Sequence, residues 1–399
     1  MRILVLTSVY KDYSLGNRDT STNIVNSFVH DWENQGHDVV VVHNSHCYPA
    51  AVHKIPARIK SKLAARMGFA IADYDAVREK TYDDGAKVFR LPIKKLVPHK
   101  TPSEKVIKLQ IKKIVNMLDE LNFVPEVITG HWASPQMELI SELKKIYNCK
   151  TACVLHGTGY VSDPSFDSKK YLQGIDKLGC RSMAQAKQIQ KLLQLEKSPF
   201  VCYSGVPDSY IEKCNLLIEK FRCINKWKIT FVGRLVFYKN VDTVIKALAK
   251  IKNVDWEFNI VGDGAEKKAL EELASSLEIE EKVHFWGKIS RDEVMDILNE
   301  THIFVMISTN EIFGLVYLEA MASSCLTIAS KNGGVDGIIV NEKNGFLCEE
   351  GNCTELEYII KRIMDSDDKN IVSVVQNGYL TAHEYSDSKM AQRYLDSII

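Results

Sequence analysis

Short strand-like runs alternate with stretches of helical periodicity along most of the chain. In the first half the strand-like runs are RILVLTS, DVVVVH, EVITGH and KTACVLHG, and in the second half they are WKITFVG, WEFNIVG, KVHFWG, THIFVMIS and CLTIAS. Between them, segments such as NIVNSFVHDWENQG and EKVIKLQIKKIVNMLDEL place apolar residues at helical spacing. This alternation predicts an α/β protein whose parallel sheets are covered by helices on both faces.

The length of the chain predicts two domains. Its 399 residues exceed what one ordinary hydrophobic core holds. The turn-rich segment YSGVPDS suggests a boundary, giving a first domain of residues 1–203 and a second of residues 204–384. Each domain has the size of a doubly wound, Rossmann-like unit. We expect the two to face each other across a cleft, because ligands of such sheets bind at the carboxyl ends of the strands.

Composition narrows the class of protein. A hydrophobic content of 45% is typical of a globular chain. The opening residues MRILVLTSVYKDY predict a first strand rather than a signal peptide or membrane span, which suggests a cytoplasmic protein. The ten cysteines include no CxxC pair, so we expect free thiols and no structural zinc site.

Charge is unevenly distributed although the net charge is zero. Residues 1–200 hold 29 basic against 20 acidic side chains, and residues 201–399 hold 22 against 31. The segment Lys54–Lys113 alone has 16 basic and 6 acidic residues. This asymmetry suggests an anionic partner for the first half, or else only a solvated basic face.

Part of this basic segment has the pattern of an amphipathic helix. In KIPARIKSKLAARMGFAIADY an apolar residue recurs every four positions beside a basic stripe. The helix would suit an anionic membrane surface, or it would pack its apolar stripe on its own domain. The apolar positions are Ile59, Leu63, Met67 and Ile71, and the basic ones are Arg58, Lys62 and Arg66.

Two carboxylates follow the apolar run THIFVMIS, in the stretch NEIFGLVYLEAM. Glu311 would lie in the loop at the end of that strand, and a helix can begin near Gly314. The unpaired backbone N–H groups of residues 313–316 would then suit a phosphate, and Glu319 would reach ribose hydroxyls. The alternative is that one acid is an ordinary loop residue and the other lies on a solvated helix face.

Two cations follow another predicted strand, in FVGRLVFYKNVDTVIKAL. Arg234 offers a planar fork to phosphate oxygens, and Lys239 offers a point charge. In isolation, two basic residues in a loop are more often solvated than functional. Together with the two acids they predict an anion-binding edge on the second sheet.

These motifs resemble the nucleotide-sugar-binding domain of GT-B glycosyltransferases of family 4, the retaining, group 1 type. The family pairs two glutamates with seven residues between them, as at Glu311 and Glu319, and has a VGR…K motif like that of Gly233, Arg234 and Lys239. The segments NIVGDGAEKKALEELA and NGGVDGIIVNEKNGFL match further family segments, so the resemblance extends over nearly all of residues 227–350.

The resemblance implies a role for each matching position. The two cations would hold the donor diphosphate, Glu319 the ribose and Glu311 the donor sugar, while Lys288 lies where members bind the base. The implied catalytic residues are Glu311, His156, Arg234 and Lys239. The implied donor-binding residues are Gly16, Gly233, Arg234, Lys239, Lys288, Phe313, Gly314, Leu315, Val316 and Glu319.

The first half resembles the family more loosely. The loop after its first strand, YKDYSLGNRDTST, has the single glycine Gly16 where members are glycine-rich. His156 in LHGTGY occupies a position where members often have a histidine facing acceptor and donor sugar, and His131 in TGHWASP is a second, acceptor-side candidate. By resemblance, the final helix, residues 385–399, packs back on the first domain.

The resemblance implies a metal-independent glycosyltransferase without a cofactor. The donor would be a nucleotide sugar, UDP-linked in preference to GDP-linked, and the acceptor a glycan or lipid-linked glycan in surface polysaccharide or lipopolysaccharide biosynthesis. No nucleic acid partner is expected, and the enzyme would be cytoplasmic or peripheral on the inner face of the membrane. Neither Asp73–Asp75 nor Asp365–Asp367 follows a predicted strand as a metal-binding DxD does. The alternatives are a nucleotide-sugar epimerase or hydrolase of the same fold, or a non-catalytic subunit of a transferase complex.

Overall fold

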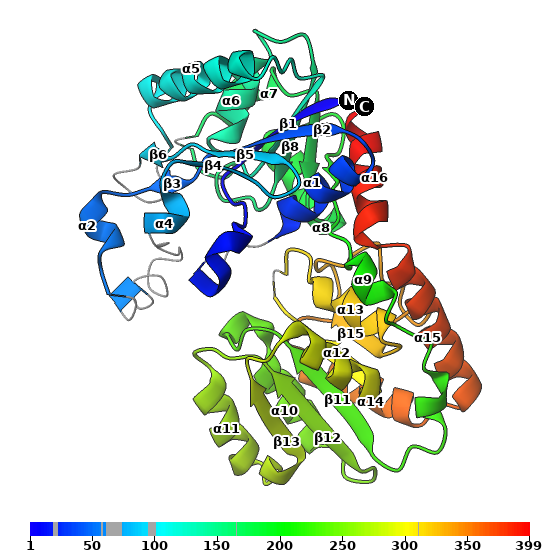
Figure 1. The fold of residues 1–399 in the computed structure, drawn as a ribbon. Helices are drawn as coiled ribbons and strands as arrows, with labels where there is room; N and C mark the ends of the chain where they lie inside the picture. The colour runs from blue at the N-terminus through cyan, green and yellow to red at the C-terminus, as the bar shows by residue number, and fades with distance from the viewer. Residues whose placement is uncertain (19–22, 57–58, 61–73, 95–100, 165, 310) are drawn as a thin grey trace. The chain divides into compact units, whose positions relative to one another are not determined.

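The computed structural model describes residues 1–18, 23–56, 59–60, 74–94, 101–164, 166–309 and 311–399. The chain divides into two compact units (Figure 1). Unit 1 comprises Met1–Arg181, Gln185–Cys202 and Met390–Ile399, and unit 2 comprises Ser182–Ala184 and Tyr203–Lys389. The division after Cys202 falls one residue before the boundary expected from the sequence.

Unit 1 is built on one large sheet. Within the described residues the sheet has eight strands in the order β10-β9-β8-β7-β1-β2-β5-β4, and β3 and β6 form a separate pair. The predicted alternation of strands and helices is confirmed, because the neighbours of β1 pair with it in parallel. The strands are β1 (Arg2–Thr7), β2 (Asp38–His43), β3 (His46–Cys47), β4 (Lys80–Asp83), β5 (Lys87–Arg90), β6 (Ile93–Lys94), β7 (Val127–His131), β8 (Lys150–Leu155), β9 (Lys177–Cys180) and β10 (Phe200–Val201).

One strand of this sheet departs from the parallel arrangement. β4 runs antiparallel to β5, which the alternation of strands and helices does not predict. The connection Asp84–Ala86 is too short for a crossover helix, so the two strands must form a hairpin. Its turn contains Gly85 at φ 107°, a backbone conformation that residues other than glycine rarely adopt.

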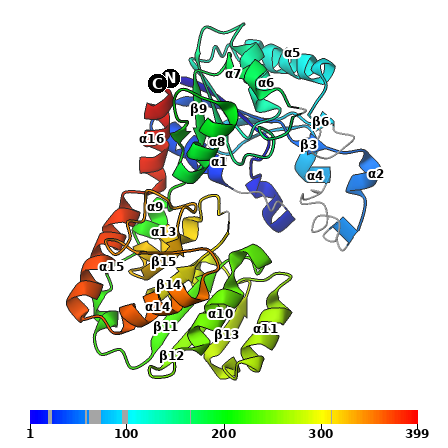
Figure 2. The same ribbon diagram turned by 180° about the vertical axis from the view of Figure 1, so that it is seen from behind.

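Helices cover both faces of the unit 1 sheet. α5 and α6 lie on one face, where they pack on Leu4 and Leu6 of β1. α1 and the C-terminal helix α16 lie on the other (Figures 1 and 2). The helices are η1 (Tyr13–Arg18), α1 (Ile24–Asn34), α2 (Ala50–His53), α4 (Tyr74–Val77), α5 (Glu104–Glu120), α6 (Gln136–Leu143), α7 (Ser168–Leu172) and α8 (Met183–Leu193).

The last residues of the chain belong to unit 1. α16 (Asp387–Ile398) buries Tyr394 against Phe28, at a ring-centroid distance of 5.2 Å, and the indole of Trp32 donates a 3.0 Å hydrogen bond to the carbonyl of Ala391. The hydroxyl of Tyr394 also bonds to Thr129 on β7. Unit 1 therefore has a core assembled from both ends of the sequence.

Unit 2 is a second doubly wound sheet. Its six strands in the described residues have the order β13-β12-β11-β14-β15-β16, and all pair in parallel. α10 packs with α11 and α14, and α13 packs with α15 (Figure 2). The strands are β11 (Trp227–Val232), β12 (Trp256–Val261), β13 (Val283–Gly287), β14 (Ile303–Met306), β15 (Leu326–Ser330) and β16 (Phe346–Cys348). The helices are α9 (Asp208–Ile211), η2 (Ile218–Phe221), η3 (Phe237–Lys239), α10 (Val241–Ala249), α11 (Lys267–Ser276), η4 (Glu280–Lys282), α12 (Arg291–Glu300), α13 (Leu315–Ala322), α14 (Cys353–Met364) and α15 (Asp368–His383).

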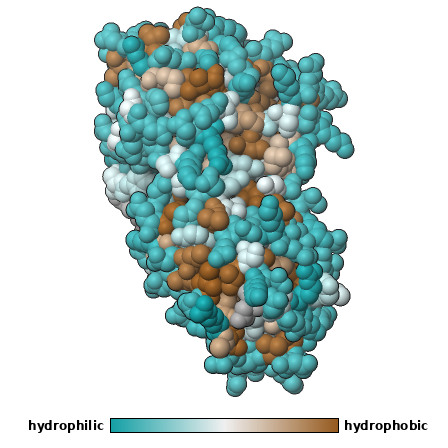
Figure 3. All heavy atoms as spheres, turned by 90° about the vertical axis from the view of Figure 1, so that its right-hand side faces the viewer, coloured by the Kyte–Doolittle hydropathy of each residue, from teal (hydrophilic) through white to brown (hydrophobic). Residues whose placement is uncertain are grey.

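On the face drawn in Figure 3, hydrophilic residues predominate and hydrophobic residues form smaller patches between them. Among the described residues, no helix is both long and apolar enough to cross a membrane. Of the amphipathic segment predicted around Lys54–Ile71, residues 57–58 and 61–73 lie outside the described residues.

Candidate active site

The two predicted cations follow β11 at the carboxyl edge of the unit 2 sheet. Gly233 and Arg234 come directly after the strand, and Lys239 ends η3. Glu311 follows β14, the neighbour of β11, and its carboxylate forms an ion pair with the Lys239 ammonium. Both side chains are about 85% buried, with exposed fractions of 13% and 15%. The fold thus brings together a lysine and a glutamate that are 72 residues apart in the sequence.

Arg234 is the more exposed of the two cations. Its guanidinium donates a 3.2 Å hydrogen bond to the hydroxyl of Tyr238, and the carbonyl of Tyr238 accepts one from the N–H of Thr309. The loop after β11 is therefore attached to the loop after β14 by its backbone as well as by the Lys239–Glu311 pair. An exposed guanidinium on a fixed loop is able to bind a phosphate group.

The GDG segment, Gly262–Gly264, packs against the backbone of the loop that carries Arg234. A Cβ atom at Gly262 would lie 1.8 Å from the carbonyl oxygen of Gly233, and one at Gly264 would lie 2.2 Å from that of Leu235. Gly262 also has φ 134°. The N–H of Leu235 bonds to the carbonyl of Asp263 at 3.0 Å. These glycines thus allow the loop after β12 to pack directly on the loop that carries Arg234.

The helix after β14 begins one residue later than Gly314, at Leu315. Gly314 is its N-cap residue, with φ 78° and no side-chain cap. The first N–H groups of a helix have no partner within it, so those of Leu315 and Val316 are available to an anion. Phe313 is buried, and Gly334 packs on its backbone, where an added Cβ would lie 2.4 Å from the carbonyl oxygen.

Glu319 lies on the second turn of α13 and forms an ion pair with Arg291, the first residue of α12. Its exposed fraction is 12%, against 44% for Arg291, whose guanidinium lies 5.8 Å from the ring centre of Tyr210. Lys288 is exposed in the loop between β13 and α12. Sequence reasoning did not identify Arg291, since a single arginine at a helix start carries no distinguishing pattern.

A partly buried lysine connects the far ends of these two helices. The ammonium of Lys220 donates hydrogen bonds to the carbonyls of Leu298 and Asn299 on α12 and, at 2.8 Å, to that of Ser323 at the end of α13. Burial lowers its pKa. The lysine bonds to carbonyls at the C-terminal ends of both helices, and it fixes α12 relative to α13, which carries Glu319.

In unit 1 the two predicted histidines contact each other. Nδ1 of His131, the last residue of β7, lies 3.0 Å from Nε2 of His156, which follows β8. Burial, with a smaller contribution from the Arg181 cation, lowers the pKa of His131 to about 3 and that of His156 below its usual value. His131 is fully buried, whereas His156 is partly exposed.

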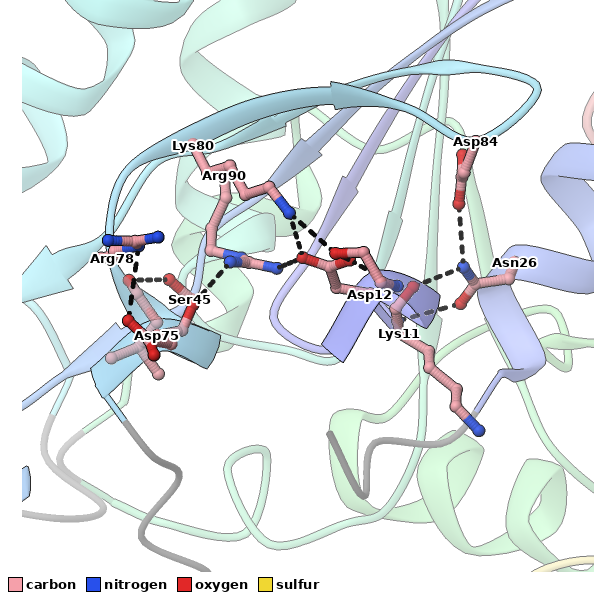
Figure 4. Close-up of polar contacts among 11 residues, drawn as sticks. Lys11, Asp12, Asn26, Ser45, Asp75, Arg78, Lys80, Asp84 and Arg90 are labelled. Carbon is pink, nitrogen blue, oxygen red and sulfur yellow. Dashed lines mark hydrogen bonds and ion pairs between the residues drawn. The ribbon is translucent and has the colours of Figure 1, made fainter. Parts of the chain in front are cut away.

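The loop after β1 is held by an acidic residue that sequence reasoning missed. Asp12, 1% exposed, accepts hydrogen bonds from Lys80 at 2.8 Å and from the fully buried Arg90 at 2.9 Å (Figure 4). Burial would raise the pKa of Asp12, but the hydrogen bonds from Lys80, Ser14 and Arg90 outweigh it and lower the pKa to about 2. Gly16 lies in η1, which follows this anchor.

Polar contacts continue on both sides of Asp12. Asn26 on α1 bonds to the backbone of Lys11 and to Asp84, and Arg90 also donates to the carbonyl of Asp75 (Figure 4). The β1–α1 loop therefore rests on the β4–β5 hairpin through buried charges rather than through close backbone packing by glycines. The only sequence signal for this arrangement was the scarcity of glycine in the loop.

Possible metal ligands do not gather in the described part of the chain. No group of three or more His, Cys, Asp or Glu side chains there has the arrangement of a metal site. Of the two DxD-like strings, the first begins at Asp73, outside the described residues, and the second ends at Asp367, whose side chain caps α15.

Two doubly wound units, the second with cations and acids gathered at the carboxyl ends of its strands, define an α/β protein of the GT-B type. Residues 217–380 match the family model for glycosyl transferases group 1. The match lies within unit 2, so that part of the chain is similar to group 1 glycosyltransferases.

Individual relatives are similar to parts of the chain. The chain is 28% identical over 240 residues to the N-acetyl-alpha-D-glucosaminyl L-malate synthase of Bacillus anthracis, a match covering 57% of this chain and 62% of that one. It is 29% identical over 170 residues to the alpha-monoglucosyldiacylglycerol synthase of Streptococcus pneumoniae, covering 42% and 38%. Both matches span less than two thirds of the relative's length.

A solved structure supports the fold over the whole chain. Anabaena HepE in complex with UDP is 18% identical, has a TM-score of 0.67, and is matched over 100% of this chain and 99% of that one. At this identity the likeness shows the shared fold, and UDP is a ligand of HepE.

Proposed function

We propose that the protein is a retaining glycosyltransferase that moves a sugar from a nucleotide-sugar donor, UDP-linked in preference to GDP-linked, to a glycan or lipid-linked glycan acceptor. The observation that carries the proposal is the Lys239–Glu311 pair beside Arg234, at the ends of β11 and β14. A cation and an acid at one edge of the sheet supply two things that a nucleotide sugar needs. The cation is a partner for its phosphates, and the acid accepts hydrogen bonds from the sugar hydroxyls.

Each residue has a distinct task in this proposal. Arg234 and Lys239 bind the diphosphate and stabilise the negative charge that develops on it as the glycosidic bond breaks, which is usually the largest catalytic term. The N–H groups at the start of α13 add to this stabilisation. Glu311 accepts hydrogen bonds from the donor sugar, and Glu319 accepts them from the ribose. On donor binding, phosphate oxygens replace Glu311 as the partner of Lys239.

The chemistry proposed here uses protein cations in place of a metal ion. The departing diphosphate is neutralised by a guanidinium, an ammonium and helix N–H groups, all of which come from unit 2. No cofactor is required, because the nucleotide sugar already carries an activated leaving group.

We propose a lipid-linked acceptor at the cytoplasmic face of the membrane, in surface polysaccharide or lipopolysaccharide synthesis. The support is a basic stripe on α5, part of the segment Lys54–Lys113. Lys105, Lys108 and Lys112 are exposed around Leu109, which is itself 59% exposed. These four residues recur at helical spacing and form one face. Such a face suits anionic headgroups, each lysine contributing about 1 kcal/mol.

Vesicle sedimentation tests the membrane part of the proposal. Replacing the three lysines of α5 by glutamate should abolish binding to phosphatidylglycerol vesicles at low salt. The same change at three exposed lysines of unit 2 should not. If the wild-type protein ignores anionic vesicles at low ionic strength, the acceptor is instead a soluble sugar. The control residues are Lys252, Lys268 and Lys343.

A panel of nucleotide sugars tests the transferase assignment. A donor at ~100 times its Kd should stabilise the protein by roughly 2.7 kcal/mol in a thermal-shift assay. With an acceptor, the product should keep the anomeric configuration of the donor by NMR. Inversion would overturn the retaining assignment, nucleotide release without any acceptor would indicate a hydrolase, and no stabilisation by any donor would indicate a non-catalytic subunit.

A further inference from the structure

His131 is enclosed within unit 1 and is not accessible to a ligand. Its side chain is 0% exposed. The ring stacks on Phe28 at a centroid distance of 5.9 Å and an angle of 18°, and it meets Tyr394 edge to face at 5.5 Å and 86°. His131 was predicted as an acceptor-side residue. With this burial, any effect on a substrate must pass through the one polar partner that it has in the described structure, His156.

At least one of the two contacting histidine rings must be neutral. Nδ1 of His131 and Nε2 of His156 are 3.0 Å apart, so one nitrogen must carry a proton and the other must accept it. If both rings were protonated, two N–H groups would face each other. Burial and the Arg181 cation disfavour the charged form of both rings and lower both pKa values. Both rings are therefore neutral at neutral pH, and one proton lies between the two facing nitrogens.

The surroundings of His131 decide which ring donates. Its Nε2 is buried and has no hydrogen-bond partner in the described part of the chain. A proton on Nε2 would be a buried N–H without an acceptor, whereas a proton on Nδ1 leaves only an unused acceptor, which is less costly. The proton on Nδ1 also makes the bond to His156. His131 is therefore the donor, and the proton of neutral His156 must lie on Nδ1.

Trp132 holds the His156 ring in this arrangement at the expense of backbone strain. Its φ is 72°, a rare conformation for a bulky residue. The strained position lets its N–H bond to the carbonyl of Val154 at 3.0 Å, while its ring stacks on that of His156 at 4.0 Å and 18°. Strain of this kind costs on the order of 1–3 kcal/mol and gathers at functional sites. Trp132 thus fixes the orientation of the His156 ring, and His131 determines which nitrogen of that ring carries the proton.

We propose that His131 and Trp132 are positioning residues that hold His156 as the neutral tautomer protonated on Nδ1, so that His156 presents an N–H donor to a sugar oxygen. In this arrangement His156 is not a base, because its other nitrogen is occupied by His131. Only the identity of the ligand rests on the proposed transferase function. The tautomer is a property of unit 1 alone.

Ring-nitrogen NMR of histidine-labelled protein tests the tautomer without any substrate. In the wild type we expect His156 protonated on Nδ1 and not on Nε2, and we expect neither ring to titrate near the usual pKa of histidine, because burial lowers both pKa values. His131→Phe preserves the aromatic packing but removes the bond, so His156 should lose its fixed tautomer. Protonation of wild-type His156 on Nε2, or its titration near pH 6.5, would overturn the proposal.

Kinetics distinguish positioning from simple packing. His131→Asn places an amide N–H where Nδ1 lies, so it should keep kcat within about threefold of the wild type. His131→Phe should lower kcat about tenfold with little change in the KM for the nucleotide sugar. This loss is smaller than the roughly 10² to 10³-fold loss of rate that follows when a hydrogen-bond donor to the transition state is removed outright. The exposed His284→Asn serves as the control. If the Asn and Phe variants lose kcat equally, His131 acts by packing alone.

A pH profile provides a second kinetic readout. The ionisable groups packed against the pair are the Arg181 cation, the Tyr394 phenol and the Cys153 thiol. Burial raises the pKa of the last two, so they stay neutral below pH 8. His131→Phe should therefore give kcat a new dependence between about pH 5 and 7, and a profile identical to the wild type would overturn the proposal. If no donor supports turnover, the NMR result still decides.

Discussion

Asp12→Asn tests the buried charge cluster that holds the β1–α1 loop. The substitution preserves size but removes the counter-charge of Arg90, which is 0% exposed. The pKa of Asp12 falls from 3.8 to about 2 on folding, and at about 1.4 kcal/mol per unit this is worth about 2 kcal/mol at neutral pH. Leaving one partner of a buried pair uncompensated costs more, on the order of 3–5 kcal/mol. We therefore expect a loss of at least about 2 kcal/mol.

The measurement must report on unit 1 by itself, because unfolding of a chain with two units need not be two-state. Hydrogen exchange followed by mass spectrometry has that resolution. Peptides from β1 and β5 should exchange about 30-fold faster in the variant at pH 7, and peptides from β11 should be unchanged. Asp119→Asn, at an exposed position of α5, is the matched control.

The sign of the pH dependence gives a second check. The folded pKa of Asp12 is lowered, so its stabilising contribution is complete above about pH 4 and is lost as the pH falls toward 2. Across that pH interval, the difference in stability between the wild type and Asp12→Asn should disappear. If the variant exchanges like the wild type at pH 7, the buried pair does not stabilise the loop and the argument fails.

Three further predictions concern the proposed donor site of unit 2. Arg234→Ala, at an exposed position, should lower turnover about 10² to 10³-fold with unchanged melting temperature. Lys239→Ala should lower turnover by a similar factor and also lower the melting temperature, because it leaves the carboxylate of Glu311 buried without its partner. Wild-type rates in both variants would contradict the diphosphate assignment. By calorimetry, Glu319→Ala should weaken binding of the free nucleoside diphosphate, whereas Glu311→Gln should weaken only binding of the full donor; equal losses on both ligands would remove the distinction. Gly262→Ala would place a Cβ 1.8 Å from a carbonyl oxygen and should weaken diphosphate binding by displacing the loop of Arg234. Unchanged affinity there would show that the loop adapts.

The fold was predictable because strand–helix alternation is a local property. Runs such as DVVVVH and WKITFVG became β2 and β11 because an apolar, β-branched run is stable only where both faces of the sheet are covered. The antiparallel strand β4 was missed because KTYD is short and half exposed. Its signal lay in the turn around Gly85 rather than in the strand itself.

The candidate site was predictable only in part, for a related reason. Glu311 and Lys239 were recognisable from motifs within single loops, and the fold then paired them. Asp12 and Arg90 lie 78 residues apart, and neither position carries a local pattern. Periodicity indicates which residues are buried, but it does not indicate which buried charges meet. The same holds for the contact between His131 and His156.

The contribution of α16 to unit 1 bears on how the protein is synthesised. Tyr394, Leu395 and Ile398 are buried and, with Ala391, they follow unit 2 in the sequence, so the ribosome makes them after unit 2. Domains generally fold as units during synthesis, in N-terminal order. Unit 1 cannot complete its core at that stage, because Trp32 and Phe28 lack the partners that α16 supplies until residues 390–399 emerge from the ribosome. Unit 2 is therefore able to complete its core before unit 1, and the nascent first unit exposes an apolar face that a chaperone would bind.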